Sequence, residues 1–302
     1  MANINDSFND KQLAVLITCH NRRDTTLSCL KALYQQDVII DVFLVDDGSS
    51  DGTTEAINSY YPDVNVIEGN GNLYWGGGMR LAFAEAMKHS YSYYLWLNDD
   101  TLLEPQAINN LLDIYENLVQ SGYTNSIVVG STKDAVTGEP TYGGAAQSKL
   151  WYTKKFEFVE PGQTSQECDT FFGNCVLIPD LVAAKVGNID DVYIHTMGDL
   201  DYGLRAGKLG CSIWAAPGFV GTCSRNSIGG SWADTNIPFY QRLKKVLQLK
   251  SFPFKSWTVF CKRYSGPFWF IYWSLPYLRS VIGYKDLNKS ISFRKEVKRE
   301  NT

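Results

Sequence analysis

Residues 93–103 read YYLWLNDDTLL: five apolar side chains run into Asn98, Asp99 and Asp100, and the chain then turns apolar again. An unbroken apolar run of this length is typical of a strand that is buried on both faces of a parallel sheet. Two adjacent carboxylates repel each other and resist burial, so such a pair is stable only where positive charge compensates it. The stretch therefore predicts a core strand whose end opens into a site for a cation.

The same unit recurs on the N-terminal side of this stretch. Short apolar runs at 13–18, 42–45, 64–68 and 93–97 are each followed by a polar segment and then by a helical pattern ending near 34, 60, 89 and 120. Strands that alternate with helices predict an α/β fold with a doubly wound, mainly parallel sheet. Further strands are predicted at 126–130, 174–178 and 211–215. Within this fold we expect helices near 53–60, 78–89 and 105–120.

Ligands of doubly wound sheets bind outside the carboxyl ends of the strands. The residues predicted to lie at that edge are Thr18, His20, Asn21, Asp46, Asp47, Gly71, Asn72, Asn98, Asp99 and Asp100. The set is acidic, and the sequence contains no G-x-x-x-x-G-K-[ST] phosphate loop and no glycines after the first strand. Because Mg²⁺ and Mn²⁺ favour carboxylate oxygens and bridge a diphosphate, we expect one of these ions to mediate the binding of a phosphate ligand.

Each acidic pair also has a purely structural interpretation. Asp99 and Asp100 are suited to capping a helix that begins near Leu102 to Pro105. Asp46 and Asp47 fit a polar turn before the next helix. The position of both pairs at neighbouring strand ends favours the ligand interpretation, in which Asp46 and Asp47 accept hydrogen bonds from a base and a ribose.

Composition and cysteine usage set the class of protein. The 302 residues are 44% apolar and 14% aromatic, which is ample for a globular core. The seven cysteines are odd in number and form no C-x-x-C pair, so we expect reduced thiols in a cytosolic protein without a secretory leader. No apolar run approaches the roughly 18 residues of a membrane span.

The charge is divided unevenly along the chain. Residues 242–300 hold 14 Lys/Arg against 3 Asp/Glu, whereas the rest holds 14 against 29. Basic residues mixed with Trp, Phe and Tyr are typical of segments that lie among lipid headgroups, so we expect 241–302 to be a helical region at the inner face of the cell membrane. The alternative is a helical layer packed on the preceding domain. Nucleic-acid binding is disfavoured, because the acidic body would repel phosphates and no recognition motif is present.

The motifs, in this order, resemble the family 2 glycosyltransferases of the GT-A fold between about Leu13 and Asn226. AVLITCHNR resembles the opening strand and base-binding loop of the family, and LVDDGSSDGT resembles its second signature, in which Asp47 would contact the base. NGNLYWGGGMRLAFAEA is similar to the donor loop, which includes Trp75. LWLNDD is similar to the acidic metal motif, with Asp100 as the principal metal ligand and Asp99 beside it.

Two later segments extend the resemblance. HTMGDLDYGLRAGKLG is similar to the family segment Glu-Asp-x-Asp followed by Arg, which makes Asp199 the catalytic base, Asp201 and Arg205 its supports on the acceptor side, and Gly198 the substitute for Glu. FFGNCVLIP resembles the acceptor-side segment that contains Gly173 and Asn174. The structural alternatives are a helix N-terminus capped by Asp199 and a strand with a bulge at Gly173.

The resemblance implies an inverting, metal-dependent transfer of a sugar from a nucleotide-diphosphate donor to a hydroxyl of a lipid-linked or oligosaccharide acceptor. Because WGGGMR resembles the rhamnosyl and galactofuranosyl branches, dTDP-rhamnose is the first donor expected and a UDP-sugar the second, in the synthesis of bacterial surface polysaccharide such as O-antigen or capsule. The domains expected are a catalytic domain at 1–240, divided into nucleotide-binding (11–120) and acceptor-binding (121–240) halves, and the basic region at 241–302.

Some assignments remain open between two interpretations. Arg80 stands where many members of the family carry Asn, and is either a second contact to the phosphates or an exposed helix residue. No histidine follows Asp199, so the metal is held either by acids, diphosphate and water or with help from His195. A sugar-phosphate nucleotidyltransferase and a catalytically silent nucleotide-binding scaffold are the rival functions. The first would be expected to carry a glycine-rich N-terminal loop, which CHNRR lacks.

Overall fold

A computed structural model of the chain describes residues 13–148, 156–225, 231–232, 234 and 236–282. The chain divides into two compact units, Met1–Arg225 and Asn226–Thr302. The boundary expected from the sequence, after residue 240, falls inside helix α7 (Phe239–Val246) of the second unit.

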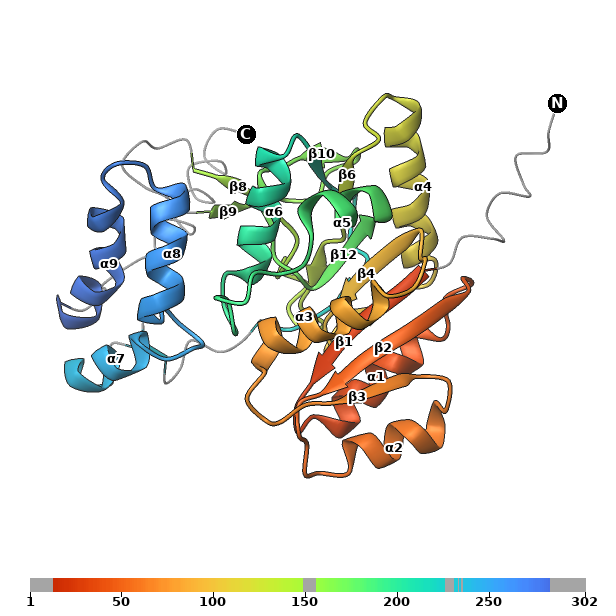
Figure 1. Ribbon diagram of the computed structural model, residues 1–302, viewed down its shortest axis with the longest axis horizontal. Coiled ribbons are helices and arrows are strands. Elements are labelled where there is room, and N and C mark those ends of the chain that lie inside the picture. The colour runs from red at the N-terminus through yellow and green to blue at the C-terminus, as the bar shows by residue number, and fades with distance from the viewer. Residues whose placement is uncertain (1–12, 149–155, 226–230, 233, 235, 283–302) are drawn as a thin grey trace. The chain divides into compact units, whose positions relative to one another are not determined.

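The first unit is built on an eight-stranded sheet with the order β10-β13-β6-β12-β4-β1-β2-β3 (Figure 1). The strands are β1 (Leu13–Cys19), β2 (Ile40–Asp46), β3 (Asn65–Glu68), β4 (Tyr93–Leu97), β6 (Ser126–Val129), β10 (Gln166–Glu167), β12 (Cys175–Pro179) and β13 (Ser212–Ala215). β1 pairs in parallel with β2 and β4, and β12 is antiparallel to both β4 and β6. The prediction of a doubly wound, mainly parallel sheet is confirmed.

Helices cover both faces of this sheet, and the strands alternate between them. Leu13, Val15 and Ile17 join the core under α1 (Arg23–Leu33), α2 (Thr53–Tyr60) and α4 (Ala107–Gln120). Ala14 and Leu16 join the opposite core, under α3 (Tyr74–Ala86), α5 (Asp180–Val186) and α6 (Gly198–Lys208). Burial on both sides explains why these strands read as unbroken apolar runs.

Two small sheets complete the first unit. One has the order β11-β8-β9 and the other β5-β14-β7. Their strands are β5 (Leu102–Leu103), β7 (Thr132–Lys133), β8 (Gly144–Gln147), β9 (Phe156–Phe158), β11 (Thr170–Phe171) and β14 (Gly221–Thr222). Because β5 follows Asp100 almost directly and α4 begins only at Ala107, the acidic pair caps no helix. The capping interpretation of Asp99 and Asp100 was wrong.

Helix α3 begins at Tyr74, four residues before the expected start near 78, so the three glycines of WGGG lie inside the helix. They allow close packing. A Cβ on Gly76 would lie 2.2 Å from the backbone oxygen of Tyr193, and one on Gly78 would lie 2.0 Å from Oγ1 of Thr18. The glycines therefore let α3 pack closely against Thr18 and Tyr193. The sequence pattern had indicated a loop at these positions.

The second unit contains α7, α8 (Phe254–Tyr264) and α9 (Trp269–Ile282), and α9 includes Pro276. Two indole hydrogen bonds join α8 to α9: Trp257 Nε1 donates to the carbonyl of Trp273 at 2.9 Å, and Trp273 Nε1 donates to Oγ1 of Thr258 at 2.8 Å. Among the described residues, no helix is both long and apolar enough to cross a lipid bilayer. Residues 283–302 of the predicted basic region lie outside the described part.

Candidate active site

The acidic pair at the end of β4 meets the guanidinium group of Arg22, from the loop after β1. Arg22 Nη1 lies 3.0 Å from Oδ1 of Asp99, and Nη2 lies 2.9 Å from Oδ2 of Asp100. Burial raises the pKa of Asp99 to about 7, an effect that Arg22 opposes and the Asp100 carboxylate reinforces. In this structure the positive charge that the two carboxylates require is Arg22, a residue that the sequence analysis did not assign to the site.

A turn at Gly173 and Asn174 connects this acidic end to the rest of the site. The backbone N–H of Asn98 donates to the carbonyl of Asn174 at 3.0 Å. The Asn174 side-chain amide donates to Sγ of Cys223 at 3.2 Å, and that thiol lies 3.3 Å from Oδ1 of Asp100. Cys223 therefore helps to position Asp100, although 123 residues separate them and no sequence signal links the two.

Asp199 lies in the first turn of α6, on the other side of the same turn. Its Oδ2 accepts the backbone N–H of Gly173 at 3.0 Å, and its Oδ1 accepts that of Leu200 at 2.8 Å. Burial raises the pKa of Asp199, while these two N–H groups hold the increase back. A fixed carboxylate with a raised pKa is suited to remove a proton from a hydroxyl group near neutral pH.

Trp75 fills the space between the acidic end and Asp199. Its Nε1 donates to Oδ1 of Asn98 at 2.7 Å. A Cβ built on Gly173 would lie 2.8 Å from Cζ2 of Trp75 and 3.2 Å from Cβ of Asp199, so all three groups meet at this glycine. The structure thus brings together Trp75 and Asn98, predicted for the donor side, Gly173, predicted for the acceptor side, and Asp199, predicted as the base.

The two acids at the end of β2 hold loops of the chain. Asp47 accepts the backbone N–H groups of Gly71, Leu73 and Tyr74 at 2.8 to 2.9 Å. Asp46 accepts the N–H of Ser49 at 3.0 Å, and its second oxygen accepts the hydroxyl of Thr54 in α2. These contacts fit the structural interpretation of the pair as turn and helix supports. The assignment of both residues to a base and ribose stays a prediction.

The loop after β1 is fastened to the loop after β2. His20 Nδ1 lies 2.6 Å from the carbonyl of Asp47, and Asn21, which has a positive φ of 50°, accepts the N–H of Ser50 at 2.7 Å. His20 and Asn21 are exposed. Asn72, in the loop before α3, is also exposed, whereas Thr18 is buried beneath Gly78. Among the residues predicted for this edge, His20, Asn21 and Asn72 are thus the exposed ones.

Asp201 and Arg205 form a buried pair behind Asp199. Arg205 Nε lies 2.7 Å from Oδ2 of Asp201, whose side chain is fully buried. The other nitrogens of Arg205 donate to the carbonyls of Val186 and Asn188 at 2.8 and 2.9 Å. The two residues thus fix α6 to the segment that leads toward residue 193, and their assignment as supports on the acceptor side stays a prediction.

Arg80 and His195 lie near the N-terminal half of α3. The carbonyl of Arg80 accepts the side-chain amide of Asn188 at 3.0 Å, and the residue is half-exposed. His195 Nδ1 lies 3.5 Å from the N–H of Trp75, and its ring is 5.8 Å from that of Tyr74. In the structure His195 therefore contacts the donor loop.

The acidic end of β4 is the predicted metal site. In the described part of the chain, no group of three or more His, Cys, Asp or Glu side chains is arranged to hold an ion. Asp99 and Asp100 still fit Mg²⁺ or Mn²⁺, because such ions are commonly held by one or two carboxylates together with substrate phosphates and water. The half-buried carboxylate of Asp100 is the more accessible of the two.

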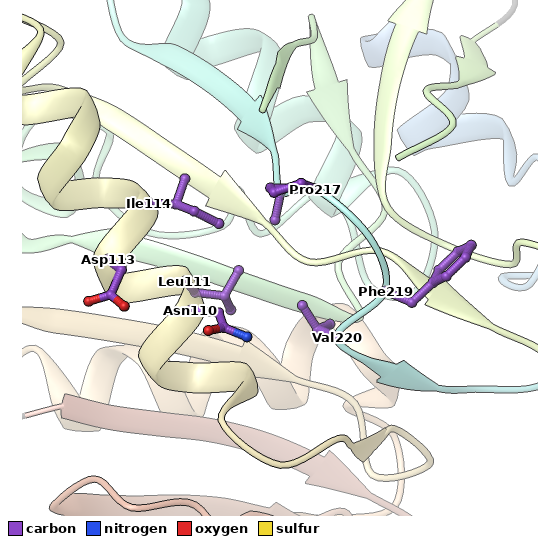
Figure 2. A pocket seen from close by; sticks show the side chains of 8 residues that line it. Asn110, Leu111, Asp113, Ile114, Pro217, Phe219 and Val220 are labelled. Atoms are coloured by element: carbon purple, nitrogen blue, oxygen red, sulfur yellow. The ribbon is translucent and has the colours of Figure 1, made fainter. Parts of the chain in front are cut away.

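A surface pocket of about 230 Å³ lies elsewhere, between α4 and residues 216–220 (Figure 2). Figure 2 shows Asn110, Leu111 and Asp113 on α4, across from Pro217 and Val220. Its lining contains none of the residues predicted for the site.

Comparisons with known proteins agree with the geometry. A sequence profile described as Glycosyl transferase family 2 matches residues 14–178. An N-acetylglucosaminyl-diphospho-decaprenol L-rhamnosyltransferase of Mycobacterium tuberculosis is 26% identical over 192 residues, which are 57% of this chain and 62% of that protein. A 4,4'-diaponeurosporenoate glycosyltransferase of Staphylococcus aureus is 25% identical over 111 residues, 36% of this chain and 30% of that protein. The chain spans less than two thirds of the length of either relative.

Two solved structures share the fold. The mannosyltransferase PcManGT from Pyrobaculum calidifontis, in complex with GDP-Man and Mn²⁺, superposes with a TM-score of 0.51 at 15% identity, covering 96% of this chain and 80% of that one. Staphylococcus aureus TarS gives a TM-score of 0.51 at 12% identity, covering 83% of this chain and 42% of that one. At these identities the likeness establishes the architecture, and the predicted GT-A type of fold is confirmed.

Proposed function

The chain belongs to glycosyl transferase family 2, and from this premise we propose that it moves a sugar from a nucleotide-diphosphate donor to an acceptor hydroxyl with inversion at the anomeric carbon. The observation that carries the proposal is the turn at Gly173 and Asn174. Gly173 holds the carboxylate of Asp199, and Asn174 holds the strand end that carries Asp99 and Asp100. A base and an acidic diphosphate site are thereby connected through two adjacent residues.

The reaction is a single displacement. Asp199 accepts the proton of the acceptor hydroxyl while that oxygen forms a bond to the anomeric carbon. The bond from this carbon to the diphosphate oxygen breaks, and its electron pair leaves with the nucleotide diphosphate. The backbone N–H groups of Gly173 and Leu200 bind different oxygens of Asp199, and a carboxylate oxygen has a second lone pair that can take the proton.

Charge on the departing diphosphate needs a positive partner. A Mg²⁺ or Mn²⁺ ion held by Asp100 and Asp99 would supply Lewis-acid stabilisation to the leaving group. Beside these carboxylates the chain fixes Trp75, whose Nε1 donates to Oδ1 of Asn98. The aromatic face of Trp75 is suited to pack on a sugar ring and to exclude water from the reacting carbon.

Comparison of Asp199→Asn with the native chain tests the catalytic role. General base catalysis contributes about 10²- to 10⁴-fold, so we expect the rate of transfer to fall by that order. Asp191→Asn is the matched control, since Asp191 is an exposed carboxylate in the segment before α6. Equal transfer by Asp199→Asn and the native chain would remove the base assignment and favour the scaffold function.

The donor and acceptor are proposed from the relatives. We infer dTDP-rhamnose as the first donor and a UDP-sugar as the second, with a lipid-linked or oligosaccharide acceptor in bacterial surface polysaccharide synthesis. The mycobacterial relative is described as a rhamnosyltransferase acting on a decaprenol-linked diphosphate sugar, which supports this choice. A thermal-shift panel of nucleotides and nucleotide sugars with and without Mn²⁺ distinguishes them, because a ligand of the native state raises Tm.

A lipid-linked acceptor would be presented at a membrane, and we infer that the second unit makes peripheral contact with its inner face. Residues 242–282 contain eight Lys or Arg and no Asp or Glu. Phe254, Phe268 and Phe270 are each more than half exposed, and Lys255 and Lys262 are exposed near them in sequence. Each basic residue near an anionic leaflet contributes about 1 kcal/mol to binding.

Vesicle sedimentation tests this contact. The native chain should pellet with vesicles rich in phosphatidylserine, less so at high salt, and poorly with neutral vesicles. Replacing Phe268 and Phe270 by Ser should weaken pelleting without unfolding, because both side chains are exposed. Unchanged pelleting by the double variant and no preference for anionic lipid would contradict the proposal.

A further inference from the structure

The carboxylates of Asp99 and Asp100 offer no oxygen that lacks a partner within the chain. Arg22 takes Oδ1 of Asp99 and Oδ2 of Asp100. Oδ2 of Asp99 accepts the hydroxyl of Thr26 at 3.4 Å, and Oδ1 of Asp100 faces Sγ of Cys223 at 3.3 Å. At the site that the proposed function assigns to a dication, Arg22 therefore already holds one oxygen of each carboxylate.

We propose that Arg22 is an internal competitor of the dication: the guanidinium and the ion occupy the same carboxylate oxygens and exclude each other. The identity of the ion rests on the proposed function. The new element is the order of two steps: Arg22 leaves the carboxylates before the ion binds them. The chain without donor binds the ion weakly, because Arg22 must first leave. A nucleoside diphosphate favours the exchange, since it brings both new oxygen ligands for the ion and negative charge for the released guanidinium.

The local structure allows Arg22 to leave. Its side chain is 43% exposed and belongs to the residue that precedes α1, whereas the Asp99 side chain is only 7% exposed. The guanidinium and a dication cannot occupy the site together, because their positive charges would repel each other strongly at a separation of a few ångströms. The exchange replaces one positive partner by another, so the buried carboxylate of Asp99 keeps a counter-charge before and after it.

The adjacent residue provides a control. Arg23 is the first residue of α1 and is exposed, and its backbone N–H donates to Oδ2 of Asp51. Arg22→Gln and Arg23→Gln remove the same charge one residue apart. Only Arg22→Gln removes a contact with Asp99 and Asp100. Comparison of the two variants therefore distinguishes competition at the carboxylates from the general effect of removing one positive charge.

The experiment measures the binding of Mn²⁺ alone to the full chain by the electron paramagnetic resonance signal of the free ion. We expect Arg22→Gln to bind Mn²⁺ roughly ten-fold more tightly than the native chain, the order expected for loss of a bidentate, partly exposed pair. Arg23→Gln should bind like the native chain. Equal or weaker binding by Arg22→Gln, or an equal gain in Arg23→Gln, would overturn the inference.

A second measurement uses the native chain and so does not depend on the folding of a variant. Arginine side-chain NMR with Mg²⁺ and UDP or dTDP should show that the hindered guanidinium signal of Arg22 becomes mobile or changes partner when the ion binds. An Arg22 signal unchanged at saturating ion would overturn the competition. Sugar transfer that depends on Asp199 would stand in that case, so failure of this inference is distinguishable from failure of the proposed function.

Discussion

Gly173→Ala tests whether packing at Gly173 sets the distance between Asp199, the proposed base, and Trp75 on the donor side. The new Cβ would lie 2.8 Å from Cζ2 and 3.0 Å from Cη2 of Trp75, and 3.2 Å from Cβ of Asp199. An indole ring cannot bend, and its Nε1 is held by Asn98 at 2.7 Å. Because Gly173 does not have a positive φ, the effect comes from contact rather than from backbone strain.

The expected magnitude follows from these contacts. Overpacking of this kind typically costs about 1–3 kcal/mol of folding free energy. A misplacement of about 1 Å costs roughly 10²-fold in rate, so a shift of a few tenths of an ångström in Asp199 or Trp75 should reduce kcat/KM by about ten-fold. Urea unfolding and steady-state transfer measure the two effects separately.

Two further variants serve as controls for Gly173→Ala. Gly207→Ala, also in the first unit, adds a methyl group that meets nothing within 4 Å, and it should leave kcat/KM unchanged. Trp75→Phe removes the atoms that clash, so the loss in the Gly173→Ala/Trp75→Phe double variant should be smaller than the sum of the two single losses. Native kcat/KM and native stability in Gly173→Ala would refute the proposed spacing.

Three other predictions follow from the site. Burial raises the pKa of Asp199, so this base becomes protonated as the pH falls through the raised value. The acidic decline of kcat/KM should therefore occur at a higher pH than for an ordinary carboxylate. In the pH profile of Asp199→Asn this acidic decline should be missing. Asp201→Asn leaves Arg205 without its buried partner and should lower the unfolding free energy by about 3–5 kcal/mol in urea, whereas an unchanged midpoint would contradict the pairing. Gly76→Ala would place a Cβ 2.2 Å from the carbonyl of Tyr193 and should lower Tm; a native Tm would show that α3 tolerates the methyl group.

The sheet was predictable because its strands are buried on both faces. β1, β2 and β4 read as apolar runs, and each is followed by a polar loop and a helix, so the order of elements and the edge where they end follow from pattern alone. The start of α3 was not predictable in the same way. The glycines of WGGG have low intrinsic helix propensity, and the contacts of Gly76 and Gly78 that favour them come from distant segments.

The acids of the site were found from the sequence, but their partners were not. Arg22 and Asp99 are 77 residues apart, and Cys223 and Asp100 are 123 residues apart, so only the folded chain brings them together. One signal was present: Arg22 stands three residues after the end of β1, next to the strand that carries the acids. An arginine at that edge opposite two carboxylates is a candidate partner on charge alone.

The stereochemistry of the product tests the central claim most directly. Transfer with the donor identified in the thermal-shift panel is followed by NMR of the anomeric proton, in the native chain, Asp191→Asn and Asp199→Asn. The account predicts a product of inverted anomeric configuration from the first two chains and almost none from the third. A product of retained configuration, or undiminished inverted product from Asp199→Asn, would contradict it.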